Sequence, residues 1–489
     1  MKVKEDAVLA LLICLCSAMA RNEERLHIVM FPWLAFGHMI PNLELAKLIA
    51  EKGHHVSFVS TPRNIERLPK VSPNLATLIN FVKLPLPKVP NLPENAEATT
   101  DVPYDVVQYL KKAYDALEEP FTRFLESSNA DWLFYDFIPF WAASVASKLG
   151  IGTVFFSIYT VPLMTFMGPA MFLTGAEPSP RTKLEDYTVP PLWIPFPTTV
   201  AFRYYEVVKI ADSLSDNESG VADTYRLGRT IQNCDFVAIR GCTRFERQWF
   251  QVLEDIYQKP VIPVGQLPNT VSKEGEEKDT WQWMIDWLDK QVEGTVVYVA
   301  FGSEAKPSQE EVTEIGLGLE KSKLPFLWVL KLQRGPCDPE VLRLPEGFEE
   351  RTRGRGVVCS TWVPQLKILG HVAVGGFLTH SGWSSVVEAV QNEKPMVLLT
   401  FLADQGINAR VLEEKKMGYS VPRDEHDGSF TSDSVAHSLR LVMFEEEGRP
   451  YRENIKDVKD LFVNTENQER YIENLLNLLS ERRAPNLMA

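Results

Sequence analysis

The segment from Trp362 to Gln405 constrains the fold more than any other part of the chain. It contains two short apolar runs, 374–379 and 395–401, and each is followed by a run with helical spacing. Buried strands that alternate with helices are typical of a parallel sheet covered by helices. The segment therefore predicts part of an α/β domain in which ligands bind at the carboxyl ends of the strands.

Polar residues follow both of these strands. Residues 380–385 (HSGWSS) place an imidazole, hydroxyls and a glycine where a helix begins. Free N–H groups and the positive end of the helix dipole make such a place suitable for an anion. Glu388 lies one turn further on, where a carboxylate suits a ribose diol, and Asp404 and Gln405 open the next helix. The pattern predicts a crevice for a nucleotide.

The rest of the chain is long enough for a second such domain. Its 489 residues exceed what one compact core holds, and 45% hydrophobic with 24% charged residues is typical of a globular protein. The net charge of −14 argues against nucleic acid or an anionic membrane as a partner. We expect two doubly wound, Rossmann-like domains of the α/β class.

The first half predicts two strand–helix–strand units. Residues 26–31 form a strand, a loop over 32–40 carries His38, and Pro41 opens a helix. In the second unit a strand at 132–135 precedes Asp136, and a helix follows over 139–149. A single helix is expected between the units, over 106–124. Because the crossovers make the strands parallel, we expect the side chains of His38 and Asp136 to lie on one edge of the sheet.

An imidazole beside a carboxylate suits proton abstraction. Neutral histidine, with a pKa near 6.5, accepts a proton from a hydroxyl at physiological pH. A carboxylate on the other ring nitrogen fixes the tautomer and stabilises the imidazolium. Taken alone, His38 and Asp136 are better explained as a loop cap and a helix cap. Trp33, Phe140, Trp141 and Tyr159 are candidates for lining an acceptor pocket nearby.

The domain boundaries follow from composition. We expect a leader over 1–24, a first domain over 25–265, a polar linker over 266–280, a second domain over 281–463, and a final helical segment over 464–489. In the second domain a buried strand at 295–301 ends at Gly302 and Ser303, which gives one more hydroxyl at the same sheet edge.

The 44 positions from Trp362 to Gln405 resemble the signature box of the plant UDP-dependent glycosyltransferases that act on small molecules. The resemblance implies the GT-B architecture of two facing domains, and Phe36-Gly37-His38 and Tyr135-Asp136 resemble the family's base and its partner. It implies that the last helix packs on the first domain. The remaining implied contacts are uracil with Trp362 and Val363, ribose with Gln365 and Glu388, phosphate with Ser303, His380, Ser384 and Ser385, and sugar with Trp383, Asp404 and Gln405.

The box departs from the family pattern at two positions. Ser384 stands where the family usually has Asn, and Ser381 where it often has Cys. Segments such as 31–54 resemble the branch that adds a sugar to a sugar already on a flavonoid or terpenoid. The resemblance therefore implies a UDP-sugar donor and a small-molecule glycoside or aglycone acceptor, with UDP-glucose favoured and UDP-rhamnose or UDP-xylose left open.

No Asp-x-Asp motif or metal-ligand spacing is found in the sequence, so we expect a transferase that needs neither metal nor cofactor. Direct attack of the activated hydroxyl on the anomeric carbon of the sugar predicts that the transfer is inverting. A dinucleotide oxidoreductase is disfavoured because the first turn has only Gly37, and a serine hydrolase because a Gly-x-Ser-x-Gly elbow is missing. A non-catalytic nucleotide-sugar binder would keep the box but lose His38.

The N-terminus leaves two interpretations open. Residues 1–20 match a secretory signal peptide, and they also match an extension before a cytosolic start at Met19. The family resemblance favours a cytoplasmic monomer without stable membrane insertion. The six cysteines, Cys14, Cys16, Cys234, Cys242, Cys337 and Cys359, are too sparse for a disulfide framework and are expected to be reduced thiols.

Overall fold

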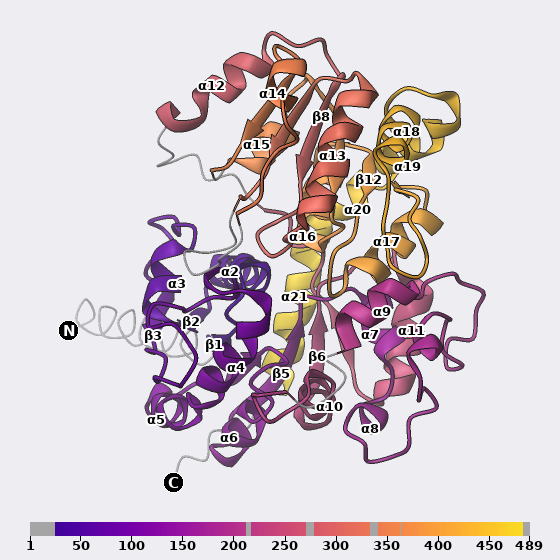
Figure 1. Cartoon of the computed structure of the whole chain (residues 1–489). Coiled ribbons are helices and arrows are strands. Elements are labelled where there is room, and N and C mark those ends of the chain that lie inside the picture. The colour runs from indigo at the N-terminus through magenta and orange to yellow at the C-terminus, as the bar shows by residue number, and fades with distance from the viewer. Residues whose placement is uncertain (1–24, 212–216, 270–277, 333–340, 362, 483–489) are drawn as a thin grey trace, which may run out of the picture.

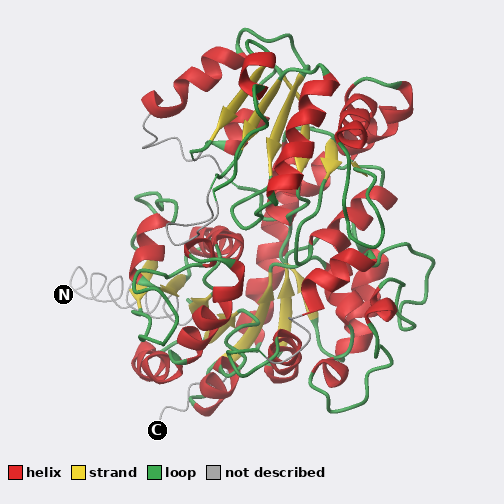
Figure 2. Ribbon diagram, viewed as in Figure 1, coloured by secondary structure: helices red, strands yellow, loops and turns green. Residues whose placement is uncertain are grey.

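The computed structural model describes residues 25–211, 217–269, 278–332, 341–361 and 363–482. The expected leader over 1–24, part of the linker (270–277) and Trp362 lie outside the described residues, as do three of the cysteines, Cys14, Cys16 and Cys337. The chain forms two lobes, each built on a wholly parallel sheet (Figure 1). Figure 2 shows the two groups of strands one above the other, each surrounded by helices.

The first sheet has seven strands in the order β3-β2-β1-β4-β5-β6-β7. They are β1 (His27–Phe31), β2 (His55–Ser60), β3 (Ile79–Lys83), β4 (Trp132–Tyr135), β5 (Gly152–Ser157), β6 (Phe236–Ile239) and β7 (Val261–Pro263). Its helices are α2 (Phe36–Glu51), α3 (Pro62–Arg67), α4 (Val107–Asp115), α5 (Glu118–Ser128), α6 (Ala142–Lys148), α7 (Val161–Met167), α8 (Ala170–Leu173), α9 (Tyr204–Ile210), α10 (Asp223–Asn233) and α11 (Arg247–Tyr257).

The second sheet has six strands in the order β10-β9-β8-β11-β12-β13. They are β8 (Val296–Ala300), β9 (Phe326–Val329), β10 (Gly356–Cys359), β11 (Val374–Thr379), β12 (Met396–Leu398) and β13 (Gly418–Ser420). The remaining helices are α12 (Lys278–Leu288), α13 (Gln309–Ser322), α14 (Phe348–Arg351), α15 (Gln365–Leu369), α16 (Trp383–Gln391), α17 (Gln405–Glu414), α18 (Ser432–Met443), α19 (Arg449–Asp457), α20 (Lys459–Val463) and α21 (Thr465–Glu481). Both sheets confirm the predicted α/β class.

The predicted loop over 32–40 is wrong at its second half. Helix α2 begins at Phe36, a turn earlier than Pro41, and the Met39 N–H donates to the Ala35 carbonyl at 2.9 Å. Pro41 therefore lies inside the helix and costs it one backbone hydrogen bond. As a consequence His38 sits on the first turn of a helix, where its backbone is fixed.

Two other helix predictions also need correction. The single helix expected over 106–124 is broken into α4 and α5, and α5 begins two residues before Pro120. A proline is tolerated in a first turn, whose N–H groups have no partner within the helix, but it disrupts the middle of a longer one. The helix expected from Pro139 begins at Ala142, after a turn in which the Ala142 N–H donates to the Pro139 carbonyl at 2.8 Å.

The last helix, α21, joins the two lobes. Figure 1 shows it, in yellow, running from the upper lobe down to the first sheet. Ile472, Leu475 and Leu479 are buried in the hydrophobic cluster that also holds Ile28 of β1. Trp132 Nε1 of β4 donates to the Leu479 carbonyl at 3.2 Å. Within the described residues, no helix combines the length and apolarity needed to cross a bilayer.

Candidate active site at the domain junction

The carboxyl ends of the strands of both sheets meet at the junction of the lobes. Loops and helices that follow these strands exchange hydrogen bonds across the junction over distances of 2.7–3.1 Å. The bonded pairs are Thr99 with Glu304, Thr160 with Asn408, Arg240 with Ser384, Trp383 with Gln266, and Thr400 with Glu206. Polar groups from both domains therefore converge on one region.

His38 and Asp136 form a buried pair at this junction. Strands β1 and β4 are neighbours in the sheet, with Phe31 opposite Tyr135, which brings together two residues 98 positions apart. His38 Nδ1 lies 2.7 Å from Asp136 Oδ2, and both side chains are buried. The Trp33 and Phe137 N–H groups donate to the same carboxylate at 3.2 and 2.8 Å. Three donors thus fix Asp136, and Nε2 of His38 is the nitrogen left to accept a proton.

The charges around His38 set its protonation. Burial by itself lowers the pKa of His38, but the Asp136 carboxylate raises it, and Asp404 and Glu304 of the second domain add to that effect, so that the pKa lies above 6.5. The second-domain carboxylates act on it because the imidazole faces the junction. A base with a raised pKa is a stronger proton acceptor once it is deprotonated.

Aromatic rings flank the imidazole. Tyr159 meets it edge to face with ring centroids 5.5 Å apart, and Phe137 lies at 6.1 Å. Of the other aromatic candidates, Trp33 and Trp141 are buried in the hydrophobic core, and Phe140 packs against the Arg226 guanidinium at 5.2 Å. Tyr159 is therefore the predicted pocket residue that the structure brings to the base.

The first turn of α16 is arranged for an anion. The helix begins after Gly382, and within the described residues no side chain caps its first N–H groups. The His380 ring lies between two glycines, because a Cβ added at Gly302 or Gly382 would come within 2.7 or 2.3 Å of Nε2. Burial lowers the pKa of His380 to about 4, so the ring is neutral at pH 7. Ser303, which follows Gly302 after β8, is exposed.

The residues predicted to hold the ribose are bonded to each other. Gln365 Nε2 donates to Glu388 Oε2 at 2.6 Å and to Ser385 Oγ at 3.1 Å, while Tyr298 donates to Gln365 Oε1 at 3.2 Å. Asn269 of the linker donates to the other Glu388 oxygen. Burial raises the pKa of Glu388. Val363, predicted to contact uracil, is buried just before α15.

The three residues predicted to face the sugar have different surroundings. The Trp383 indole is buried, donates to Gln266 Oε1 at 2.8 Å and lies against the rings of Phe245 and Phe462, so its ring belongs to the domain junction. Gln405 Oε1 accepts two backbone N–H groups, of Phe401 and Leu402, which leaves its amide nitrogen for a ligand.

Asp404 is the sugar-facing candidate whose charge acts on His38. It precedes α17 and accepts from Asn408 Nδ2 at 2.6 Å, burial raises its pKa, and it acts electrostatically on His38. The sugar contacts of Trp383, Asp404 and Gln405 stay predictions.

Sequence reasoning missed several polar residues of the junction, among them Arg240, Gln266, Asn269 and Glu304. Gln266 and Asn269 fall in the predicted linker, where most residues are polar and no pattern distinguishes these two from their neighbours. Arg240 follows the strand β6, which the sequence pattern does not predict, and Glu304 follows the predicted Ser303 directly. The position of Glu304 after a buried strand was the one available signal.

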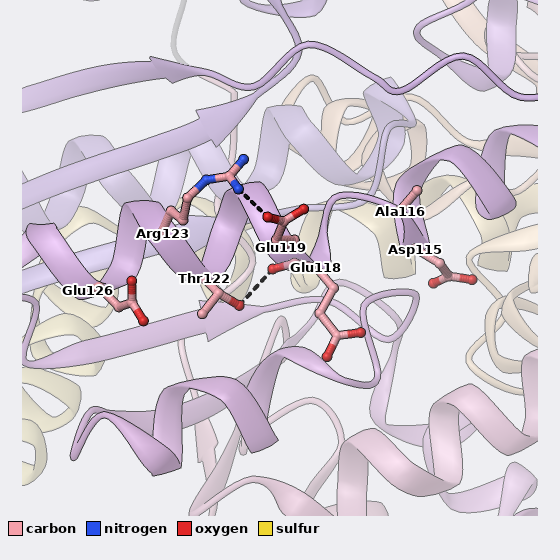
Figure 3. Close-up of a pocket in the computed structure, with 7 residues that line it drawn as sticks. All are labelled: Asp115, Ala116, Glu118, Glu119, Thr122, Arg123 and Glu126. Atoms are coloured by element: carbon pink, nitrogen blue, oxygen red, sulfur yellow. Dashed lines mark hydrogen bonds and ion pairs between the residues drawn. The ribbon is translucent and has the colours of Figure 1, made fainter.

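A hollow lies away from this junction. Figure 3 shows it on the outside of α5, lined by Asp115, Ala116, Glu118, Glu119, Thr122, Arg123 and Glu126. It holds none of the predicted site residues. In the part of the chain that the structure describes, no group of three or more His, Cys, Asp or Glu residues is arranged to hold a metal ion.

Comparison with known proteins agrees with this architecture. Residues 251–465 match the family model for UDP-glucoronosyl and UDP-glucosyl transferase. UDP-glycosyltransferase 91A1 of Arabidopsis thaliana is 51% identical over 94% of this chain and 97% of its own length. The soyasaponin III rhamnosyltransferase of Glycine max is 42% identical over 95% of this chain and 97% of its own.

Solved structures show the same fold at low identity. The UGT71G1 structure of Medicago truncatula with UDP-glucose superposes with a TM-score of 0.73, over 94% of this chain and 99% of that one, at 20% identity. The fold is therefore the two-domain GT-B architecture. With relatives of this identity over nearly its whole length, the chain belongs to the plant UDP-glycosyltransferases, in family 91.

Proposed function

We propose that this enzyme transfers a sugar from a UDP-sugar to a hydroxyl of a plant glycoside with inversion at the anomeric carbon, and that His38 is the general base. The observation that carries the proposal is the buried His38–Asp136 pair, which faces Asp404 of the second domain. The proposed base comes from the first domain and the proposed nucleotide site from the second, so the two substrates would meet at the domain junction.

In the proposed reaction one bond forms as another breaks. The acceptor hydroxyl gives its proton to His38 Nε2 while its oxygen forms a bond to the anomeric carbon. The bond from that carbon to the UDP oxygen breaks, and its electron pair leaves with the diphosphate. Attack opposite the leaving group inverts the carbon. Asp136 stabilises the imidazolium that results, because its carboxylate already accepts the Nδ1 proton.

The diphosphate is proposed to lie at the first turn of α16 and the ribose at Gln365 and Glu388. Uncapped helix N–H groups and the neutral His380 supply hydrogen bonds to the leaving group, so we propose that the reaction needs no metal. This arrangement supports the contacts predicted for Ser384 and Ser385.

For substrates we propose UDP-glucose as the donor and a flavonoid or terpenoid glycoside as the acceptor. The similarity to a soyasaponin rhamnosyltransferase supports a terpenoid glycoside and keeps UDP-rhamnose as the alternative donor. A screen of UDP-glucose, UDP-rhamnose and UDP-xylose against a panel of glycosides, read by product mass, identifies the pair. A mass gain on aglycones but not on glycosides would contradict the proposed acceptor class.

Replacement of His38 by Ala tests the base. We expect turnover to fall at least 10³-fold, within the range that general bases contribute, while the Kd for UDP stays within about twofold. The anomeric configuration of the product, read by NMR, tests inversion. Turnover retained by the variant, or a product with retained configuration, would refute the proposal.

A further inference from the structure

Arg240 is a buried cation that reaches across the domain junction. It directly follows β6, and its side chain is only 2% exposed. Nε donates to the Gln266 carbonyl at 2.8 Å and Nη2 to the Leu267 carbonyl at 3.3 Å. These bonds aim Nη1 at the second domain, where it donates to Ser384 Oγ at 2.8 Å. The guanidinium is thus held rigidly under the first turn of α16.

The charge of Arg240 is not neutralised by an ion pair within the described residues. Burial lowers its pKa to about 10, with Glu388 and Glu44 acting in the opposite direction from further away, so the side chain is charged at pH 7. Burying an unpaired cation is costly, and the cost falls when an anion binds nearby. The residue of the predicted ligand site that Arg240 contacts is Ser384, which is predicted to bind the diphosphate.

In the contact between Arg240 and Ser384, the guanidinium is the donor and the serine oxygen is the acceptor. Because the Ser384 oxygen accepts from Arg240, its own hydrogen is free to point away from the guanidinium. Ser384 lies in the uncapped first turn of α16, so that hydrogen is available to an anion at the helix N-terminus. His380 is neutral there at pH 7 and supplies no charge of its own.

We propose that Arg240 is a positioning residue of the donor site, which turns the Ser384 hydroxyl toward the donor's diphosphate and places a fixed positive charge behind it. The proposal rests on the proposed function, since it presumes that the diphosphate binds at α16. This role of Arg240 explains how Ser384 can bind the diphosphate at a position where the family usually has Asn. It also makes the donor site complete only when the two domains meet.

The test is a double-mutant cycle on the full-length enzyme with the variants R240K, S384A and R240K/S384A. Lysine keeps the charge but lacks the planar guanidinium and its several N–H donors. It therefore cannot donate to the Gln266 and Leu267 carbonyls and to Ser384 Oγ at the same time. We expect R240K and S384A each to raise the Kd for UDP about tenfold by calorimetry, and the double variant to be no weaker than S384A within about twofold.

Binding of uridine distinguishes a specific role of Arg240 at the diphosphate from general damage to the protein structure. Because uridine carries no phosphate, its Kd is expected to stay within about twofold in R240K, while the Kd values for UDP and UDP-glucose rise. R226K is the matched control: Arg226 is equally buried in the first domain but pairs with Asp115 at 2.6 Å. We expect R226K to lower the melting temperature and to leave the Kd for UDP unchanged.

Several results would overturn the role of Arg240. These are a wild-type Kd for UDP in folded R240K, equal weakening of uridine and UDP, or effects of R240K and S384A that multiply in the double variant. The proposed function fails differently, through turnover that survives loss of His38, and H38A is expected to keep the Kd for UDP. If the effects of R240K and S384A are coupled and H38A stays active, the role of Arg240 is supported and the role of His38 as the base is refuted.

Discussion

Replacing Asp136 by Asn tests the base most directly. The substitution keeps the shape of the side chain but leaves one acceptor oxygen where three N–H groups converge. The Phe137 N–H donates at 2.8 Å and the Trp33 N–H at 3.2 Å, so we expect the amide oxygen to keep the shorter bond. The amide NH₂ then faces His38 Nδ1, which must accept from it, and the ring proton moves to Nε2.

The expected loss of kcat in D136N is large because the proton of the His38 ring moves from Nδ1 to Nε2. A His38 ring that carries its proton on Nε2 does not accept one from the acceptor hydroxyl. In hydrolases where a carboxylate orients a catalytic imidazole, the same replacement lowers kcat about 10⁴-fold. We expect a fall in kcat of about 10³-fold or more, which corresponds to ~4 kcal/mol of transition-state stabilisation.

The pH profile gives a second readout of D136N. The wild-type kcat/KM is expected to rise with pH through a pKa above 6.5 as His38 loses its proton. Removing the Asp136 charge lowers the pKa of His38, so the rise of the residual activity is expected at lower pH. D115N is the control, because Asp115 also pairs with a buried side chain, Arg226, but lies away from the junction. A folded D136N with wild-type kcat and an unmoved profile would refute the assignment.

Four further outcomes are expected. E388A is expected to raise the Kd for UDP about 10- to 100-fold, because a charge-assisted bond to the ribose is lost, and an unchanged value in calorimetry would contradict that contact. L475A is expected to lower the unfolding free energy by about 3 kcal/mol in denaturant titrations, because it opens a cavity between α21 and the first sheet; a loss below 1 kcal/mol would count against that packing. Burial raises the pKa of Glu246 from 4.5 to about 7, so the stability that its protonated form contributes is present at low pH and is lost as pH rises through 7. The advantage of E246Q over wild type in unfolding free energy is therefore expected to grow by roughly 3 kcal/mol as pH rises from 5 to 8. Melting temperatures of the two proteins that change in parallel with pH would disprove this. Turnover is expected to survive EDTA, and a loss that Mg²⁺ restores would show a metal requirement.

Local patterns were sufficient for most of the strands that carry the site. β1, β4, β8 and β11 are short, almost wholly buried apolar runs, and such runs identify buried strands directly. The strands β3, β6 and β13 are not predicted, and β3 has a half-exposed burial pattern without a clear signal. The crossover rule makes these strands parallel, which let the sequence predict that His38 and Asp136 lie on one edge of the sheet.

Helix starts depended on more than local signals. Pro41 suits a first turn as a single residue, but the chain begins α2 at Phe36, because the turn closed by Met39 on Ala35 outweighs the one bond lost at the proline. The break between α4 and α5 shows the opposite case, in which Pro120 decides where a helix begins.

The sequence by itself determined the class of fold, and it predicted the nucleotide box and the His38–Asp136 pair that we propose as the base and its partner, because each depends on residues close in the chain or on strand alternation. Only the tertiary structure decided that Trp383 is buried against Gln266, that Asn269 contacts Glu388, and that Arg240 bonds Ser384. These contacts join residues more than 100 positions apart across two domains. No periodicity records such pairs, since they arise only when two separately folded sheets are brought face to face.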